Sequence, residues 1–224
     1  EQLVFIWFLL KQSGLDARLT YRDEQVFLCA YTTESVFAVP LIQLDQKTFV
    51  NISEIGSATY DEGPVYLLDF TPNPKGRSFS FSLQVMPLRP ARIEQKQLHF
   101  RFLDSLYSWP VQIDQTYIQL MSNYPFVEET EYLRAPMSTA MQNALLPKIR
   151  ASIEGMDQQL SVQFLLNFTR SAFAYKEDKA FFGRSKPMIP EEVLNYPYSD
   201  CEDRVALFYA LMKSTLGLPM ILIA

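Results

Sequence analysis

The sequence predicts an α+β protein, in which antiparallel strands and helices occupy different stretches of the chain. Residues 15–52 consist of short apolar runs separated by polar turns, and residues 60–127 hold further strand-like runs between many prolines. After Pro136, apolar residues recur at three- and four-residue steps. The first two patterns are typical of strands, whereas the last is typical of amphipathic helices. A chain of 224 residues is long enough to bury a sizeable core without disulfides or metals.

The composition fits a folded protein and narrows the expected partners. Apolar residues make up 48% and charged residues 20% of the chain, which excludes a disordered or collagen-like protein. The net charge of −5 argues against a nucleic-acid partner, because such proteins need basic groups to replace the counterions of phosphates. The longest apolar runs, 4–10 and 220–224, are too short to span a membrane. We also expect no signal peptide within this chain.

We expect three segments, at residues 1–58, 59–135 and 136–224. The first begins with a helix over 3–13 that ends at Gly14, since glycine readily adopts the left-handed conformation found at helix ends. An antiparallel meander follows. Its four strands are expected at residues 15–21, 25–31, 35–41 and 47–52, with turns at 22–24 and 45–46.

The second segment is expected to be β-rich and the third mostly helical. Half-buried strands are predicted at 78–83 and 98–102 from their alternating apolar residues. The expected helices cover residues 138–153, 160–174, a short acidic stretch near Glu191, and a stretch from about Ser199 to Leu216. Pro147 is expected to break or kink the first of these. Gly217 should end the last helix, with an apolar strand after it.

The sequence contains a single histidine, which limits any chemistry that uses an imidazole. His99 lies between Leu98 and Phe100 in a predicted strand, so we expect it on the polar face. The two cysteines, Cys29 and Cys201, suggest neither a disulfide framework nor a zinc site. We expect Cys29 to be an inert core residue, and we predict no metal or other cofactor.

Cys201 is the candidate nucleophile. Ser199 with Glu202, or Asp200 with Asp203, would form a capping box, and either places Cys201 in the first turn of a helix. Unpaired backbone N–H groups and the helix dipole there favour a thiolate. The neighbouring carboxylates oppose it. A buried, unreactive cysteine at a helix start is the alternative interpretation.

The residues around Cys201 resemble a known signature. The run YPYSDCEDRVALFYALMK at 196–213, followed by LGLP at 216–219, is similar to the cysteine helix of the transglutaminase-like superfamily. The helix and loop before it, from Leu160 onward, resemble uncharacterised secreted members from Bacteroidetes. The likeness covers about 65 residues. It implies a papain-like fold, a protein or peptide substrate, and a location in the periplasm or at the cell surface.

The resemblance also implies a Cys-His-Asp triad, in which the cysteine forms a thioester with the acyl group of an amide. Only Cys201 can be matched to that triad, because the histidine and aspartate of the family follow the Gly-Leu-Pro strand. We therefore expect this chain to be a piece of a longer enzyme, or to receive these groups from another chain, and to be inactive by itself. Tyr196 and Tyr198 either help an oxyanion hole or only pack the loop. The rival function is a non-catalytic binding or scaffold protein.

Residues 8–19 resemble residues 210–222, since both read as a helix, Gly-Leu and a strand. This suggests that residues 1–58 are a degenerate copy of the transglutaminase-like unit. No histidine lies in the meander of this first copy, and Asn51 stands roughly where an aspartate would be expected. The alternative is that any helix followed by glycine and a strand looks alike.

Overall fold

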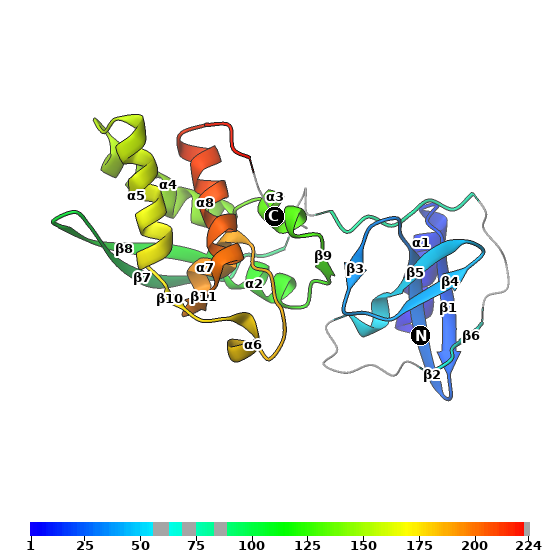
Figure 1. The fold of residues 1–224 in the computed structure, drawn as a ribbon. Helices are drawn as coiled ribbons and strands as arrows, with labels where there is room; N and C mark the ends of the chain where they lie inside the picture. Colours follow the sequence, from blue (N-terminus) through cyan, green and yellow to red (C-terminus); the bar gives the residue numbers. More distant parts are fainter. Residues whose placement is uncertain (56–62, 69–74, 83–88, 222–224) are drawn as a thin grey trace. The chain divides into compact units, whose positions relative to one another are not determined.

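The computed structural model describes residues 1–55, 63–68, 75–82 and 89–221, and it confirms the α+β class. The chain forms two compact units (Figure 1). Unit 1 contains Glu1–Ser82 and Ser122–Glu128, and unit 2 contains Leu83–Met121 and Glu129–Ala224. Residues 59–135 are therefore shared between the two units. No helix within the described ranges is both long and apolar enough to cross a membrane.

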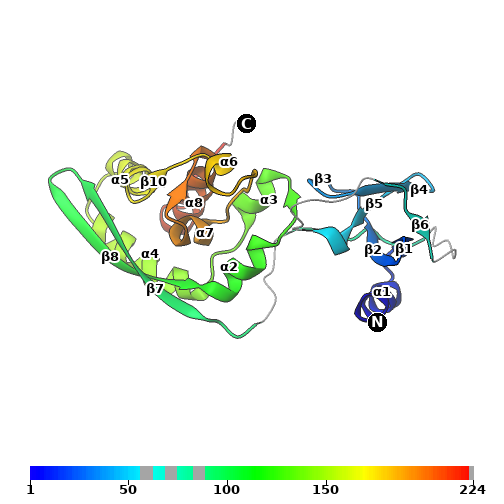
Figure 2. The same cartoon turned by 90° about the horizontal axis from the view of Figure 1, so that it is seen from below.

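Unit 1 is an antiparallel sheet covered on one face by helix α1 (Gln2–Gln12), as Figure 2 shows. The strand order is β4-β5-β2-β1-β6. The strands are β1 (Ala17–Arg22), β2 (Gln25–Tyr31), β4 (Leu41–Leu44), β5 (Lys47–Asn51) and β6 (Tyr66–Leu67). A separate pair joins β3 (Val36–Phe37) to β9 (Phe126–Val127), and the 3-10 helix η1 (Ile52–Glu54) follows β5. Trp7 of α1 packs on the sheet and donates a hydrogen bond to the carbonyl of Ala17 at 3.2 Å.

The local turn signals of unit 1 are confirmed. Helix α1 ends next to Gly14, which has a φ of 79°. The β4-β5 hairpin turns at Asp45 and Gln46, which have φ values of 51° and 64°, the backbone of a turn that matches strand twist. Asp23, which has a φ of 53°, lies in the turn between β1 and β2.

Two strand predictions in unit 1 are wrong. The strand expected at 35–41 is interrupted after Phe37, because Ala38 has a φ of 54° and Pro40 has no N–H to donate. The strand expected at 78–83 is absent from its described part, 78–82. There the N–H of Phe81 donates to the Glu34 carboxylate at 2.7 Å rather than to a neighbouring strand, and Leu83 lies outside the described residues.

Unit 2 is built on a long antiparallel hairpin of β7 (Ile93–Phe102) and β8 (Ser105–Asp114). Helices α4 (Thr139–Ile153) and α5 (Gln158–Ser171) pack against β8 and β7, and α8 (Cys201–Thr215) packs against both helices (Figure 1). Shorter elements complete the unit. They are α2 (Gln115–Ser122), α3 (Glu129–Arg134), α6 (Asp178–Phe181), α7 (Pro190–Asn195) and the parallel pair β10 (Ala174–Tyr175) and β11 (Tyr198–Ser199).

Aromatic rings form the centre of unit 2. Phe100 and Trp109 of the hairpin contact Phe164 and Phe168 of α5 with ring centroids 5.0 to 6.0 Å apart. Phe164 and Phe168 are fully buried. The alternation of β7 therefore places one of its faces, with Phe100, against the helices.

Two expectations about the helical segment need correction. Helix α4 is not broken at Pro147, because its buried face, which includes Leu145 and Ile149, stabilises the helix more than one missing hydrogen bond weakens it. After α8, Gly217 has a φ of 62° and ends the helix as expected, but residues 218–221 form no strand. Both α1 and α8 thus end near a left-handed glycine, while only α1 leads into a strand within the described ranges. The duplication stays a hypothesis.

Candidate functional site

The start of α8 is fixed by Asp200 and Asp203, so the second of the two predicted capping registers is the one present. Asp200 is the residue before the first helical turn, and its N–H donates to Asp203 Oδ2 at 3.1 Å. The other oxygen of Asp203 accepts from the N–H of Met188 at 3.0 Å. Ser199 does not cap the helix; its hydroxyl oxygen accepts from Arg204 Nε at 3.1 Å. Asp203 therefore joins α8 to the loop that precedes α7.

Buried charged groups hold that loop in place. Glu192 of α7 accepts from the N–H of Ile189 at 3.2 Å and forms an ion pair with Lys186, and both side chains are buried. Glu191 accepts from the N–H of Asp114 at 2.7 Å and from the hydroxyl of Ser138 at 2.9 Å, which ties α7 to β8 and α4. These interactions give the polypeptide around α8 a defined conformation.

The end of α7 is capped from the hairpin. Lys96 Nζ donates to the carbonyls of Leu194, Asn195 and Tyr196 at 2.8, 3.0 and 3.3 Å. Partial burial lowers the pKa of Lys96 from its ordinary value. A cation at this position satisfies carbonyls that a helix end leaves without partners.

Cys201 is the first residue of α8, and its side chain is exposed. Its thiol donates to Glu202 Oε2 at 3.2 Å. This hydrogen bond, with smaller contributions from burial and from the charge of Glu202, raises the pKa of the Cys201 thiol. The N–H of Glu202 acts in the opposite direction but is the weaker influence. The influences that raise the pKa of the thiol thus outweigh the backbone N–H that lowers it, which favours the thiol over the thiolate.

Three acidic side chains converge beside Cys201. One carboxylate oxygen each from Asp178, Asp200 and Glu202 lies within 4.8 Å of the other two. Asp178 and Asp200 are buried, and Glu202 is exposed. Burial raises the pKa of Asp178 and Asp200, and it raises that of Asp203 together with the charge of Asp200.

The other predicted residues do not join this group. His99 is exposed on the face of β7 opposite to Phe100. Its imidazole therefore points away from the face of β7 that the helices of unit 2 cover. Cys29 is fully buried in unit 1, and burial raises its pKa to about 11, as expected for an inert core thiol. Tyr196 and Tyr198 pack against Phe181, with ring centroids 6.4 and 5.1 Å away.

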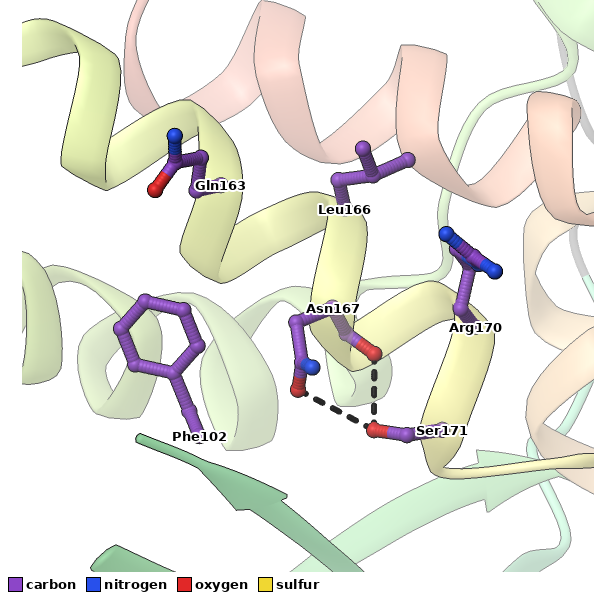
Figure 3. Close-up of a pocket in the computed structure, with 6 residues that line it drawn as sticks. All are labelled: Phe102, Gln163, Leu166, Asn167, Arg170 and Ser171. Atoms are coloured by element: carbon purple, nitrogen blue, oxygen red, sulfur yellow. Dashed lines mark hydrogen bonds between the residues drawn. The ribbon is translucent and has the colours of Figure 1, made fainter. Parts of the chain in front are cut away.

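A cavity of about 520 Å³ lies elsewhere in unit 2, along α5 (Figure 3). It is lined by Phe102, Gln163, Leu166, Asn167, Arg170 and Ser171. Asn167 and Ser171 are linked at its edge, since the Ser171 hydroxyl donates to the Asn167 carbonyl at 2.8 Å. Cys201 is not among the lining residues, so this cavity and the thiol are separate features.

Fold and site together define an α+β protein with an exposed thiol at a helix start, next to a partly buried acidic cluster. Comparisons of the chain with protein-family models, with curated proteins and with solved structures find no match.

Sequence reasoning did not find the acidic cluster or its support. The sequence pattern indicates only capping roles for Asp200 and Glu202 and an effect of their charges on Cys201, and Asp178 lies 22 residues before Asp200 with no spacing signal to connect them. The cap that Lys96 supplies to α7 joins residues about 100 positions apart. Such contacts depend on tertiary packing, so no local pattern announces them.

Proposed function

We propose that this chain carries the nucleophile of a cysteine-dependent acyl-transfer or amide-hydrolysing enzyme of the transglutaminase-like kind. The observation that carries the proposal is the exposed Cys201 thiol at the first residue of α8, on a helix start fixed by Asp203. The resemblance of residues 160–224 to that superfamily supports it. A papain-like arrangement, a protein or peptide substrate, and a location in the periplasm or at the cell surface belong to the same proposal.

The chemistry has two steps. In the first, the Cys201 thiolate attacks an amide carbonyl, the C–N bond breaks, and the departing amine takes up a proton as a thioester forms. In the second, water or another amine attacks the thioester, which releases an acid or a new amide and restores the thiol. The first step needs a base close to Cys201, since Glu202 raises the pKa of the thiol. The second step needs a base to take a proton from the attacking water or amine.

A histidine base must come from outside the described residues. His99 is the only histidine of the 224 residues, and it faces away from α8. The proposal therefore requires an imidazole that these residues do not supply. We further propose that the chain by itself does not turn over substrate.

The test uses the longest natural polypeptide that contains this chain. Amine incorporation into a protein acceptor and cleavage of a mixed pool of quenched peptides would be measured for wild type, Cys201→Ala and Cys29→Ala. We expect at least one activity in wild type, at least about a hundredfold loss in Cys201→Ala, and retention in Cys29→Ala. An activity that survives in Cys201→Ala would overturn the proposal.

A second candidate is a binding or scaffold protein that keeps the fold without chemistry. The observation that favours it is the acidic setting of Cys201, which stabilises the unreactive thiol. Lack of both activities in the longest polypeptide, with normal folding, would support this candidate.

A further inference from the structure

We propose that Asp178, Asp200 and Glu202 form a binding site for a divalent cation that prefers oxygen ligands, with Ca²⁺ as the best fit. This proposal does not depend on the proposed function of Cys201, although Glu202 also accepts a hydrogen bond from the Cys201 thiol. The inference starts from the convergence of three carboxylates from two parts of the chain. Asp178 belongs to α6, whereas Asp200 and Glu202 flank the start of α8.

The geometry suits one ion. A Ca²⁺ ion lies about 2.3 to 2.6 Å from its oxygen ligands, so two of them are at most about 5 Å apart. The three carboxylate oxygens lie within 4.8 Å of one another, so a single ion can contact all of them. Because Glu202 is exposed, water can complete the six to eight ligands that calcium takes. Magnesium is a poorer fit, since it requires a near-ideal octahedron.

A second observation is independent of the clustering. The side chain of Asp200 is buried, with only 5% of the residue exposed, and its Oδ1 has no hydrogen-bond partner among the described residues. A buried carboxylate oxygen without a partner is costly, and nearly all such atoms in proteins are satisfied. A bound cation would satisfy it.

Two cations near the cluster, Lys186 and Arg204, have other partners. Lys186 Nζ pairs with Glu192, and it is the backbone N–H of Lys186 that donates to Asp178, at 2.5 Å. Arg204 donates through Nε to Ser199 and through Nη2 to the carbonyl of Phe173. These contacts orient the surrounding backbone without giving Asp200 Oδ1 a hydrogen bond.

The four acidic side chains near the start of α8, one of them from α6, divide into two roles. Asp203 uses both of its oxygens to accept backbone N–H groups, so it is a structural cap. Asp178, Asp200 and Glu202 offer oxygens toward one another. The cation would therefore link α6 to the start of α8.

The test is calcium binding by the apo chain, prepared in EDTA and then freed of the chelator. Isothermal titration calorimetry with CaCl₂ and thermal unfolding with and without Ca²⁺ would be measured on wild type, Asp200→Asn and Glu202→Gln. The matched control is Asp104→Asn, an exposed acid in the β7-β8 turn. Cys201→Ala separates this proposal from the proposed function.

We expect one saturable site and a Ca²⁺-dependent rise in Tm for wild type, Asp104→Asn and Cys201→Ala. In Asp200→Asn and in Glu202→Gln the Kd should rise about tenfold or more, because each loses a charged ligand. Circular dichroism would check folding, and exposed Glu202 provides a variant that does not disturb the core. Absence of saturable binding in wild type, or an unchanged Kd in either folded variant, overturns the proposal.

Discussion

Replacing Glu191 by glutamine should destabilise unit 2, because both carboxylate oxygens of this buried side chain accept hydrogen bonds. Its Oε1 accepts from the Asp114 N–H and the Ser138 hydroxyl, and its Oε2 accepts from the Ser138 N–H at 3.2 Å. A glutamine oxygen can keep the first two bonds. Its NH₂ group would then face the Ser138 N–H, so one hydrogen bond to a carboxylate is lost and two donors meet.

The expected cost follows from that loss. A hydrogen bond to a charged group contributes about 1.5 to 3 kcal/mol. Leaving a buried donor without an acceptor costs a similar amount, but small shifts of the surrounding side chains reduce that cost. We therefore expect Glu191→Gln to lower the free energy of unfolding by about 2 to 3 kcal/mol. With a urea m-value of about 2 kcal/mol/M, the midpoint falls by about 1 to 1.5 M.

The assay must follow unit 2 alone. The chain has two tryptophans, Trp7 in unit 1 and Trp109 in the core of unit 2, so urea unfolding would be followed by fluorescence in a Trp7→Phe background. The matched control is Glu154→Gln, which is exposed and should change stability by less than about 0.5 kcal/mol. A Glu191→Gln effect no larger than this control would refute the reasoning.

Three further predictions concern the site and its core. Glu202→Gln should speed alkylation of Cys201 by iodoacetamide several-fold near pH 8 in EDTA, because it removes the group that raises the thiol pKa; an unchanged rate would contradict this. Burial raises the pKa values of Asp200 and Asp203 above the ordinary value of 3.8, so the folded state binds protons more tightly than the unfolded chain. The stability that these two carboxyl groups contribute is fully present below pH 3.8 and is lost as the pH rises through their raised pKa values in the folded state. Asp203→Asn should therefore reduce the fall in stability with rising pH, measured by urea unfolding in EDTA. A fall as steep as that of wild type would contradict this. Phe164→Ala should cost about 3 to 5 kcal/mol in urea unfolding, since the ring is fully buried among aromatic neighbours, and a cost below about 1 kcal/mol would show that this core is not as described.

Features that depend on neighbouring residues could be predicted from the sequence. Gly14 and Gly217 end helices because glycine tolerates positive φ, and Asp45 with Gln46 forms a tight turn between two apolar runs. Likewise, Asp200 and Asp203 place Cys201 at the start of α8 through a contact three residues long.

Features that depend on distant residues could not be predicted. Pro147 stays within α4 because that helix is buried on one face, which no local propensity reveals. Residues 78–82 look like a strand, but Phe81 bonds to Glu34, whose position is set by the rest of unit 1. The convergence of Asp178 with Asp200 depends in the same way on the path of the intervening loop.

The most direct test of a nucleophilic Cys201 is to trap its acyl intermediate. The longest natural polypeptide containing this chain would be mixed with a peptide thioester or ester substrate, quenched in acid within seconds, and analysed by peptide mass spectrometry. The account predicts an acyl group on the peptide that contains Cys201, released by hydroxylamine. An acyl group on another residue, or turnover with Cys201 unmodified throughout, would contradict it.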